Sequence, residues 1–126
     1  MLGTSRRHFP TVAGRREVCD GHELVRLGVQ IPGDMLYFQG HFPGYPILPG
    51  VAQLVPLVLA EVRSIWAELG RPTRLSRLKF RQPVFPGAEL ELQLDRLDAR
   101  VRFRLVRGQE SRACSEGTID YQLNPT

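Results

Sequence analysis

A stretch of ten consecutive residues without a charged side chain, from Val51 to Ala60, most constrains the fold of this chain. The hydrophobic pattern is helical from Val51 to Leu69 and ends at Gly70 and Pro72. Because a helix that is apolar on all sides is usually buried, the first half of this helix is expected to lie in the core. The second half carries charges from Glu61 onward and is expected to reach solvent or a partner. The chain is therefore predicted to contain one buried central helix.

Strand patterns lie on both sides of this helix in the sequence. Apolar and polar residues alternate over 22–31, 77–81, 89–94 and 100–105, and a last strand is expected over 112–123. One helix cannot cover five or more strands unless the sheet curls around it, so we expect an α+β fold in which an antiparallel sheet wraps one long central helix. Such a sheet leaves an open edge and a bare outer face, which favours dimerisation.

The length of 126 residues suits a single domain over 1–126. The formal net charge of +4 comes from four arginines that precede Glu17, because the remainder holds equal numbers of basic and acidic residues. We therefore expect residues 1–16 to form a poorly ordered basic stretch. No apolar run is long enough to cross a bilayer, and the chain is expected to be a soluble cytoplasmic protein with no membrane partner.

Basic residues are nevertheless grouped along the chain. One run without an intervening acid extends from Arg71 to Arg81, and a second extends from Arg100 to Arg107. Each run is compatible with the solvated face of a strand or with a docking surface for an acidic partner. Since the body of the chain is neutral, no nucleic-acid partner is expected.

Cysteine and histidine spacing points to no metal site and no cofactor. Cys19 and Cys114 lie far apart, and His8, His22 and His41 share no ligand spacing. The sequence also contains no phosphate-binding loop, dinucleotide fingerprint or nucleophile elbow. A function is therefore sought in the remaining motif, a loop rich in glycine and proline.

That loop precedes the predicted helix and contains one histidine. It reads Phe38-Gln39-Gly40-His41-Phe42-Pro43-Gly44-Tyr45-Pro46-Ile47-Leu48-Pro49-Gly50. Prolines restrict the backbone and glycines permit close approach, so the segment is expected to hold His41 at the start of the buried helix. Taken alone, one histidine in such a loop is more often structural than catalytic.

The whole stretch resembles the G-H-F-P-x-x-P-x-x-P-G signature of the β-hydroxyacyl-[acyl carrier protein] dehydratases, which have the hotdog fold. Its continuation from Pro46 to Gln53 looks closest to the dehydratase-like branch of aryl polyene and pigment synthesis. A second segment, from Leu78 to Gly87, resembles the F-x-x-P-V-x-P-G strand and turn of the same family, with Phe80 at the first position of that motif. With the strand order, the resemblance extends over about Glu23 to Leu123.

The resemblance implies elimination of water from a 3-hydroxyacyl thioester. It assigns His41 as the base that removes the α-proton, and the backbone N–H of Gly50 as the donor that stabilises the thioester oxygen. It also implies that the backbone carbonyl of Ile47 fixes the imidazole tautomer. The resemblance places the substrate against Phe38, Gly40, Phe42, Ile47, Pro49, Val51, Gln53 and Val55.

The sequence departs from the family at one catalytic position. The family has a carboxylate on the central helix, supplied by the opposite subunit, at the position that Val55 occupies here. A positioned acid contributes about 10²- to 10⁴-fold in rate, so its loss is expected to leave a slow enzyme or none. Gln53 is not an acid, and neither Glu61 nor Asp34 is a convincing substitute.

Two main interpretations follow. The chain is a 3-hydroxyacyl-thioester dehydratase of fatty acid, polyketide or aryl polyene synthesis, with an acyl carrier protein or CoA thioester as substrate. Alternatively, it is a catalytically impaired hotdog subunit that binds acyl chains or carrier protein, or that completes a site with another subunit. An acyl thioesterase is a third, weaker alternative. A homodimer or larger assembly is expected, and a heterodimer with a second hotdog subunit remains open.

Overall fold

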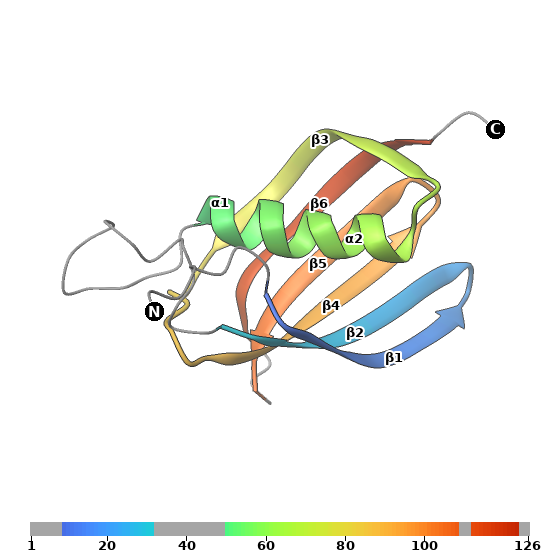
Figure 1. Ribbon diagram of the computed structural model, residues 1–126. Coiled ribbons are helices and arrows are strands. Elements are labelled where there is room, and N and C mark those ends of the chain that lie inside the picture. Colours follow the sequence, from blue (N-terminus) through green and yellow to red (C-terminus); the bar gives the residue numbers. More distant parts are fainter. Residues whose placement is uncertain (1–8, 32–49, 109–111, 124–126) are drawn as a thin grey trace, which may run out of the picture.

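The computed structural model describes residues 9–31, 50–108 and 112–123 of the chain. One antiparallel sheet of six strands curves around one helix, in the strand order β1-β2-β4-β5-β6-β3 (Figure 1). This arrangement confirms the predicted α+β architecture. The strands are β1 (Thr11–Cys19), β2 (His22–Gln30), β3 (Leu69–Phe80), β4 (Glu89–Leu97), β5 (Arg100–Arg107) and β6 (Ala113–Leu123).

The helix runs from Gly50 to Ile65 without interruption, but its middle is wound differently. It consists of α1 (Gly50–Gln53), a π-helical segment η2 (Leu54–Leu59) and α2 (Ala60–Ile65). Pro56 lies in η2 and has no N–H to donate to the preceding turn, and proline is a common cause of such local distortion. None of the described helices is long and apolar enough to cross a membrane.

The core lies between the helix and the concave face of the sheet. Residues of the helix that are almost completely buried face inward-pointing residues of β4, β5 and β6. For β4 and β5 this burial follows from the predicted alternation, because each turns every second side chain toward the helix, whereas most residues of β6 are buried whichever face they lie on. The largest fully buried side chains of the described residues are Trp66, Phe103, Ile31, Leu57, Leu92, Leu94, Leu105, Ile119, Val29 and Val58.

The N-terminal boundary differs from the prediction. Residues 11–16 were expected to belong to a poorly ordered basic stretch, but they form the first part of β1, which pairs with β2. The strand is hard to predict because a bulge between Ala13 and Arg16 breaks its alternation. At the bulge, a side chain on Gly14 would clash with the backbone carbonyl oxygen of Arg26, so only glycine fits there.

The end of the helix also differs from the prediction. The helix was expected to continue to Leu69, but it ends at Ile65, and β3 already begins at Leu69. Gly70 and Pro72 therefore lie within a strand. A proline is tolerated there because β3 is an edge strand, where one side of the backbone needs no partner.

Candidate functional site

Gly50 is the first residue of the helix and lies against an aromatic ring from the far end of β3. A side chain built on Gly50 would place its Cβ 3.0 Å from Cζ of Phe80. Glycine therefore allows close contact between the helix start and the Phe80 ring. The contact joins the two segments that the sequence comparison singled out, since one carries the Gly50 end of the loop motif and the other contains Phe80.

Gln53 and Val55 lie on opposite sides of the helix. Gln53 is 4% exposed and faces the interior, whereas Val55 is 50% exposed and faces outward. The Val55 side chain has no proton to give or accept, so this chain presents an apolar surface where the family carries an acid. The structure thus places Gly50, Gln53 and Val55 on one short stretch of helix, but Gln53 and Val55 lie on different faces of it.

Glu61 is the carboxylate nearest to Val55 along the described helix, and it points elsewhere. The side chain of Thr11, on β1, donates a hydrogen bond to it. Burial raises the pKa of Glu61 above its usual value, and the bond from Thr11 opposes that shift only in part. Since Glu61 is held toward β1 and Val55 lies on the flank facing β3, Glu61 does not replace the missing acid.

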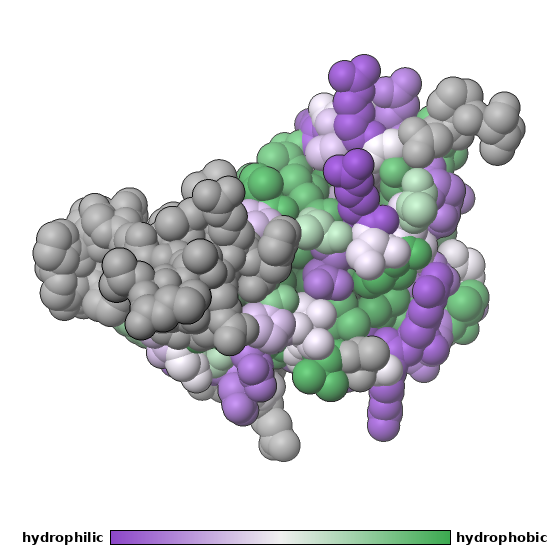
Figure 2. All heavy atoms as spheres, in the orientation of Figure 1, coloured by the Kyte–Doolittle hydropathy of each residue, from purple (hydrophilic) through white to green (hydrophobic). Residues whose placement is uncertain are grey.

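A groove of about 860 Å³ lies between the helix and the beginning of β3. The space-filling view of this face shows apolar surface over the helix and toward β3, with hydrophilic side chains beside it (Figure 2). Burial raises the pKa of Tyr121 in the groove wall. The groove is lined by Val55, Leu59 and Arg63 of the helix, by Arg71 and Pro72 of β3, and by Tyr121 of β6, among others.

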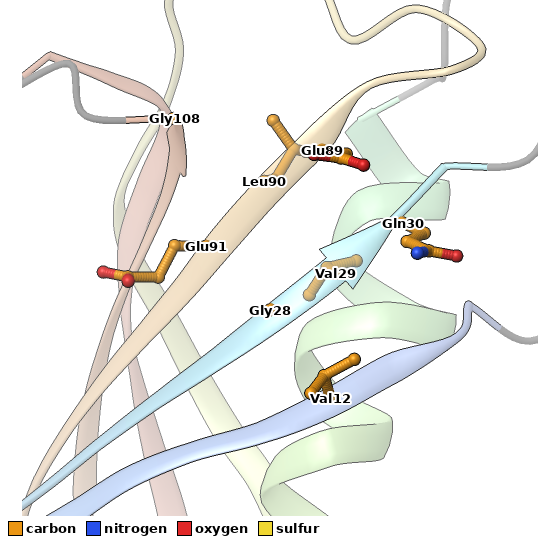
Figure 3. A pocket seen from close by; sticks show the side chains of 8 residues that line it. All are labelled: Val12, Gly28, Val29, Gln30, Glu89, Leu90, Glu91 and Gly108. Atoms are coloured by element: carbon orange, nitrogen blue, oxygen red, sulfur yellow. The ribbon is translucent and has the colours of Figure 1, made fainter.

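A second depression, of about 340 Å³, lies at the ends of β1, β2 and β4 (Figure 3). Its walls carry two carboxylates, Glu89 and Glu91, and the Gln30 amide, and Glu91 points away from the other two in Figure 3. The described residues around it include no histidine. The described lining of this depression therefore offers carboxylates and an amide but no imidazole.

Most residues of the loop motif lie outside the described part of the chain. These are Phe38, Gly40, His41, Phe42, Ile47 and Pro49, together with the side chain of Val51 and with Asp34. Their assigned roles remain predictions. Among the residues that the structure does describe, no group of three or more histidine, cysteine or acidic side chains could hold a metal ion.

Sequence reasoning did not identify Phe80 as a contact of Gly50, or the groove residues Arg63 and Tyr121, and it named Arg71 only as the start of a basic run. The phenylalanine had a usable signal, because it opens the second family motif. The groove residues had none, since they come from the helix, an edge strand and the last strand, and only the folded chain places them together.

Comparison with protein families matches residues 17–118 to the ApeI-like family, described as the ApeI dehydratase. The 3-hydroxyacyl-[acyl-carrier-protein] dehydratase FabZ of Alkaliphilus metalliredigens is 34% identical over 116 residues, which cover 82% of this chain and 79% of that protein. Some other FabZ relatives are matched over a smaller share of their length, such as 50% of the one from Geotalea uraniireducens.

Two solved structures are similar over nearly the whole chain. An uncharacterized protein from Erwinia carotovora subsp. atroseptica has a TM-score of 0.76 and 30% identity, covering 90% of this chain and 97% of its own. A chain of the dehydratase heterocomplex ApeI:P from Xenorhabdus doucetiae has a TM-score of 0.73 and 26% identity, covering 89% and 97%. These similarities confirm the predicted hotdog fold.

Proposed function

Because the chain belongs to the ApeI-like family of dehydratases, which are hydro-lyases, we propose that it is a subunit of a 3-hydroxyacyl-thioester dehydratase. The substrate chain is carried on an acyl carrier protein, as the names of the FabZ relatives suggest. The proposed pathway class is fatty acid, polyketide or aryl polyene synthesis. The observation that carries the proposal is Gly50 at the start of the buried helix, with Phe80 packed against it.

Gly50 is suited to stabilise the thioester oxygen. The first N–H groups of a helix have no partner within the helix, and the helix dipole adds positive charge at that end. An oxygen that gains negative charge as the α-proton leaves is therefore stabilised by the Gly50 N–H. The ring of Phe80 contacts the position of a Gly50 side chain and helps to exclude water from this point.

His41 is proposed to remove the α-proton, because an imidazole titrates near neutral pH. The electron pair of the broken C–H bond forms the C2=C3 double bond, and the bond from C3 to the hydroxyl oxygen breaks. That oxygen needs a proton in order to leave as water. In this family the proton comes from the helix carboxylate, and here the position holds Val55.

The missing acid is proposed to come from a different subunit. In a homodimer both sites would have valine at this position, whereas a partner with a helix carboxylate would complete the site that contains His41 and Gly50. The heterocomplex from Xenorhabdus doucetiae supports this idea, since a similar chain is part of an assembly of two kinds of dehydratase subunit. One complete site would then form in each heterodimer.

The test is turnover of a 3-hydroxyacyl-pantetheine thioester to the enoyl product by the purified chain. The unmodified chain alone is expected to show little or no turnover. Val55→Glu restores the carboxylate and is expected to raise the rate by about 10²- to 10⁴-fold. Adding His41→Ala to Val55→Glu is expected to remove that gain.

Val55→Gln is the matched control, because the amide has nearly the shape of the acid but cannot donate a carboxyl proton. Val55 is half exposed, so both substitutions are expected to leave the fold intact. Turnover by the unmodified chain that His41→Ala abolishes would contradict the need for a second subunit. Equal rates for the Glu and Gln variants would contradict the role of position 55.

A further inference from the structure

The edge strand β3 has one backbone side without a strand partner. It pairs with β6 on its inner side and forms the border of the sheet (Figure 1). Pro72 cannot donate a hydrogen bond, and pairing with β6 shifts register on both sides of it. A second irregularity lies at Arg77, whose backbone is left-handed and where the register with β6 shifts between Ser76 and Lys79. A further strand would therefore pair with β3 on either side of this bulge.

The charges on this edge are of one sign. The sequence of β3 contains four cations, Arg71, Arg74, Arg77 and Lys79, and no acid. None of the four has an ion pair or a side-chain hydrogen bond with another described residue. They also lie on the exposed part of the strand.

The two acids on the neighbouring strand β6 lie opposite Arg74 and Lys79 in register, but their ion pairs are formed with other arginines. Glu116 accepts a hydrogen bond from Arg81 at 2.9 Å, and Arg104 lies 3.8 Å from its other oxygen. Asp120 accepts a hydrogen bond from Arg100 at 2.7 Å. The positive charge of the β3 edge is therefore left for an outside group.

Pairing of β3 with a second copy of itself would bring like charges together. In an antiparallel pair of two copies of β3, the four cations of one copy lie beside the four cations of the other, because the strand contains no acid. Such cross-strand pairs of like charge are destabilising. A partner strand with acidic side chains opposite these cations would instead form favourable charge pairs with them.

An apolar surface next to this edge indicates that a protein subunit covers it. Leu75, Leu78 and Phe80 are exposed on β3, and Val55 is exposed on the helix flank that faces the same groove. A partner strand alone would leave Val55 and the groove uncovered. A partner with its own helix beside an edge strand, as in this fold, would cover both.

We infer that the β3 edge pairs with a different hotdog subunit whose own edge strand is acidic, in preference to a second copy of this chain. The inference rests on the proposed function, in which a second subunit supplies the catalytic acid. It further specifies that the edge strand of this partner is negatively charged. The positive charge on β3 destabilises the homodimer, which would have valine in both sites. The same charge favours the heterodimer, in which the site is complete.

A charge-reversed copy of this chain serves as the acidic partner in the test. The variant Arg74→Glu/Lys79→Glu is mixed with the unmodified chain, and the dimers are counted by native mass spectrometry with a mass tag on one chain. At low ionic strength, mixed pairing is expected to exceed the statistical share by about tenfold in equilibrium constant. The excess is expected to decrease as salt is added.

The matched control is Arg26→Glu/Arg102→Glu, which changes the net charge equally on the inner strands β2 and β5. It is expected to give the statistical share. A neutral variant, Arg74→Gln/Lys79→Gln, keeps the test valid if the glutamates disturb folding, and it is expected to self-associate more tightly than the unmodified chain. A statistical mixture with the charge-reversed copy, or a mixture that stays monomeric, would overturn the inference.

This readout is independent of catalysis. Val55→Glu is therefore also tested in the neutral Arg74→Gln/Lys79→Gln background, in which the homodimer is expected to form. Failure to restore turnover there would contradict the proposed function without altering the dimer distribution. A statistical dimer distribution would contradict the acidic partner even if the enzyme proves active.

Discussion

The two flanks of the central helix differ in how they are held. Toward β1 and β2, the indole of Trp66 donates a hydrogen bond to Glu23, which also accepts one from Arg16 at 2.6 Å. Arg96 lies over the Trp66 ring, 5.6 Å from its centroid, and forms an ion pair with Glu68. Toward β3, the helix instead borders a groove with half-exposed apolar side chains.

This difference indicates that one flank of the helix stabilises the fold of the chain and the other is available for assembly with a second protein. The β1 flank is completed within the chain, since its polar groups satisfy one another around a buried tryptophan. The β3 flank is left open for a second protein, with cations on the strand edge and apolar groups beside it. Substitutions on the first flank should therefore affect unfolding, and substitutions on the second should affect association and turnover.

The largest expected effect on stability is at Trp66, which is 1% exposed. Trp66→Ala is expected to reduce the free energy of unfolding by about 3–5 kcal/mol, because it leaves a cavity and removes the bond to Glu23. On the open flank, Val55→Ala is expected to cost less than about 0.5 kcal/mol. Urea denaturation measures both. Similar losses at the two positions would refute the contrast between the flanks.

A smaller effect is expected where the open flank begins, at the contact of Gly50 with Phe80. Gly50→Ala is expected to cost about 1 kcal/mol, since its Cβ would press on the ring. In a Phe80→Ala background the same change is expected to be neutral or stabilising, because alanine favours a helix over glycine. A double-mutant cycle of unfolding free energies measures this coupling, and additivity of the two changes would disprove the contact.

The ion pair of the closed flank predicts a pH dependence. The hydrogen bond from Arg16 is the main factor that lowers the pKa of Glu23 below its usual 4.5, with a further contribution from Trp66. A lowered folded-state pKa adds stability above 4.5, and that stability is lost as the pH falls through the lowered value. Glu23→Gln is expected to cost about 1 kcal/mol at neutral pH and nothing in strong acid. Unfolding curves across acidic pH test this, and a constant difference would contradict it.

The smallest effect is expected at Glu61, whose pKa is raised by burial. A raised pKa means that ionisation opposes folding, so stability is full below the usual value of 4.5 and decreases as the pH rises through the raised value. Glu61→Gln removes the charge and keeps a polar group near Thr11. It is expected to add about 0.5 kcal/mol at neutral pH and nothing at low pH, by thermal unfolding. A loss of stability at neutral pH would show that the bond from Thr11 dominates.

Regular periodicity made most of the fold predictable. β2, β4 and β5 have alternating side chains because each turns one face toward the helix, and the turn at Asp98 has the left-handed backbone that suits aspartate. The two edge strands were the exceptions. β1 contains a bulge, and β3 contains Pro72 and three register shifts, so neither shows clean alternation over its full length.

The candidate site was predictable only where it lies within contiguous motifs. Gly50 and the substitution at Val55 could be named from the sequence because the family signature fixes their spacing from His41. The groove could not, because its charge and shape depend on how β3 lies beside the helix. The basic run that starts at Arg71 was visible in the sequence, but only the fold places Arg71 at the same opening as Arg63.

The π-helical segment from Leu54 to Leu59 affects how this chain is aligned with its relatives. A π turn contains about one more residue than an α turn, and one residue corresponds to about 100° around the helix axis. A relative with a regular helix would therefore match the later helix residues only after a one-residue gap. If residue roles beyond Leu59 were carried over from a relative by counting positions along the sequence, inward-facing roles would be assigned to outward-facing residues. Positions there should therefore be matched by superposing the two structures.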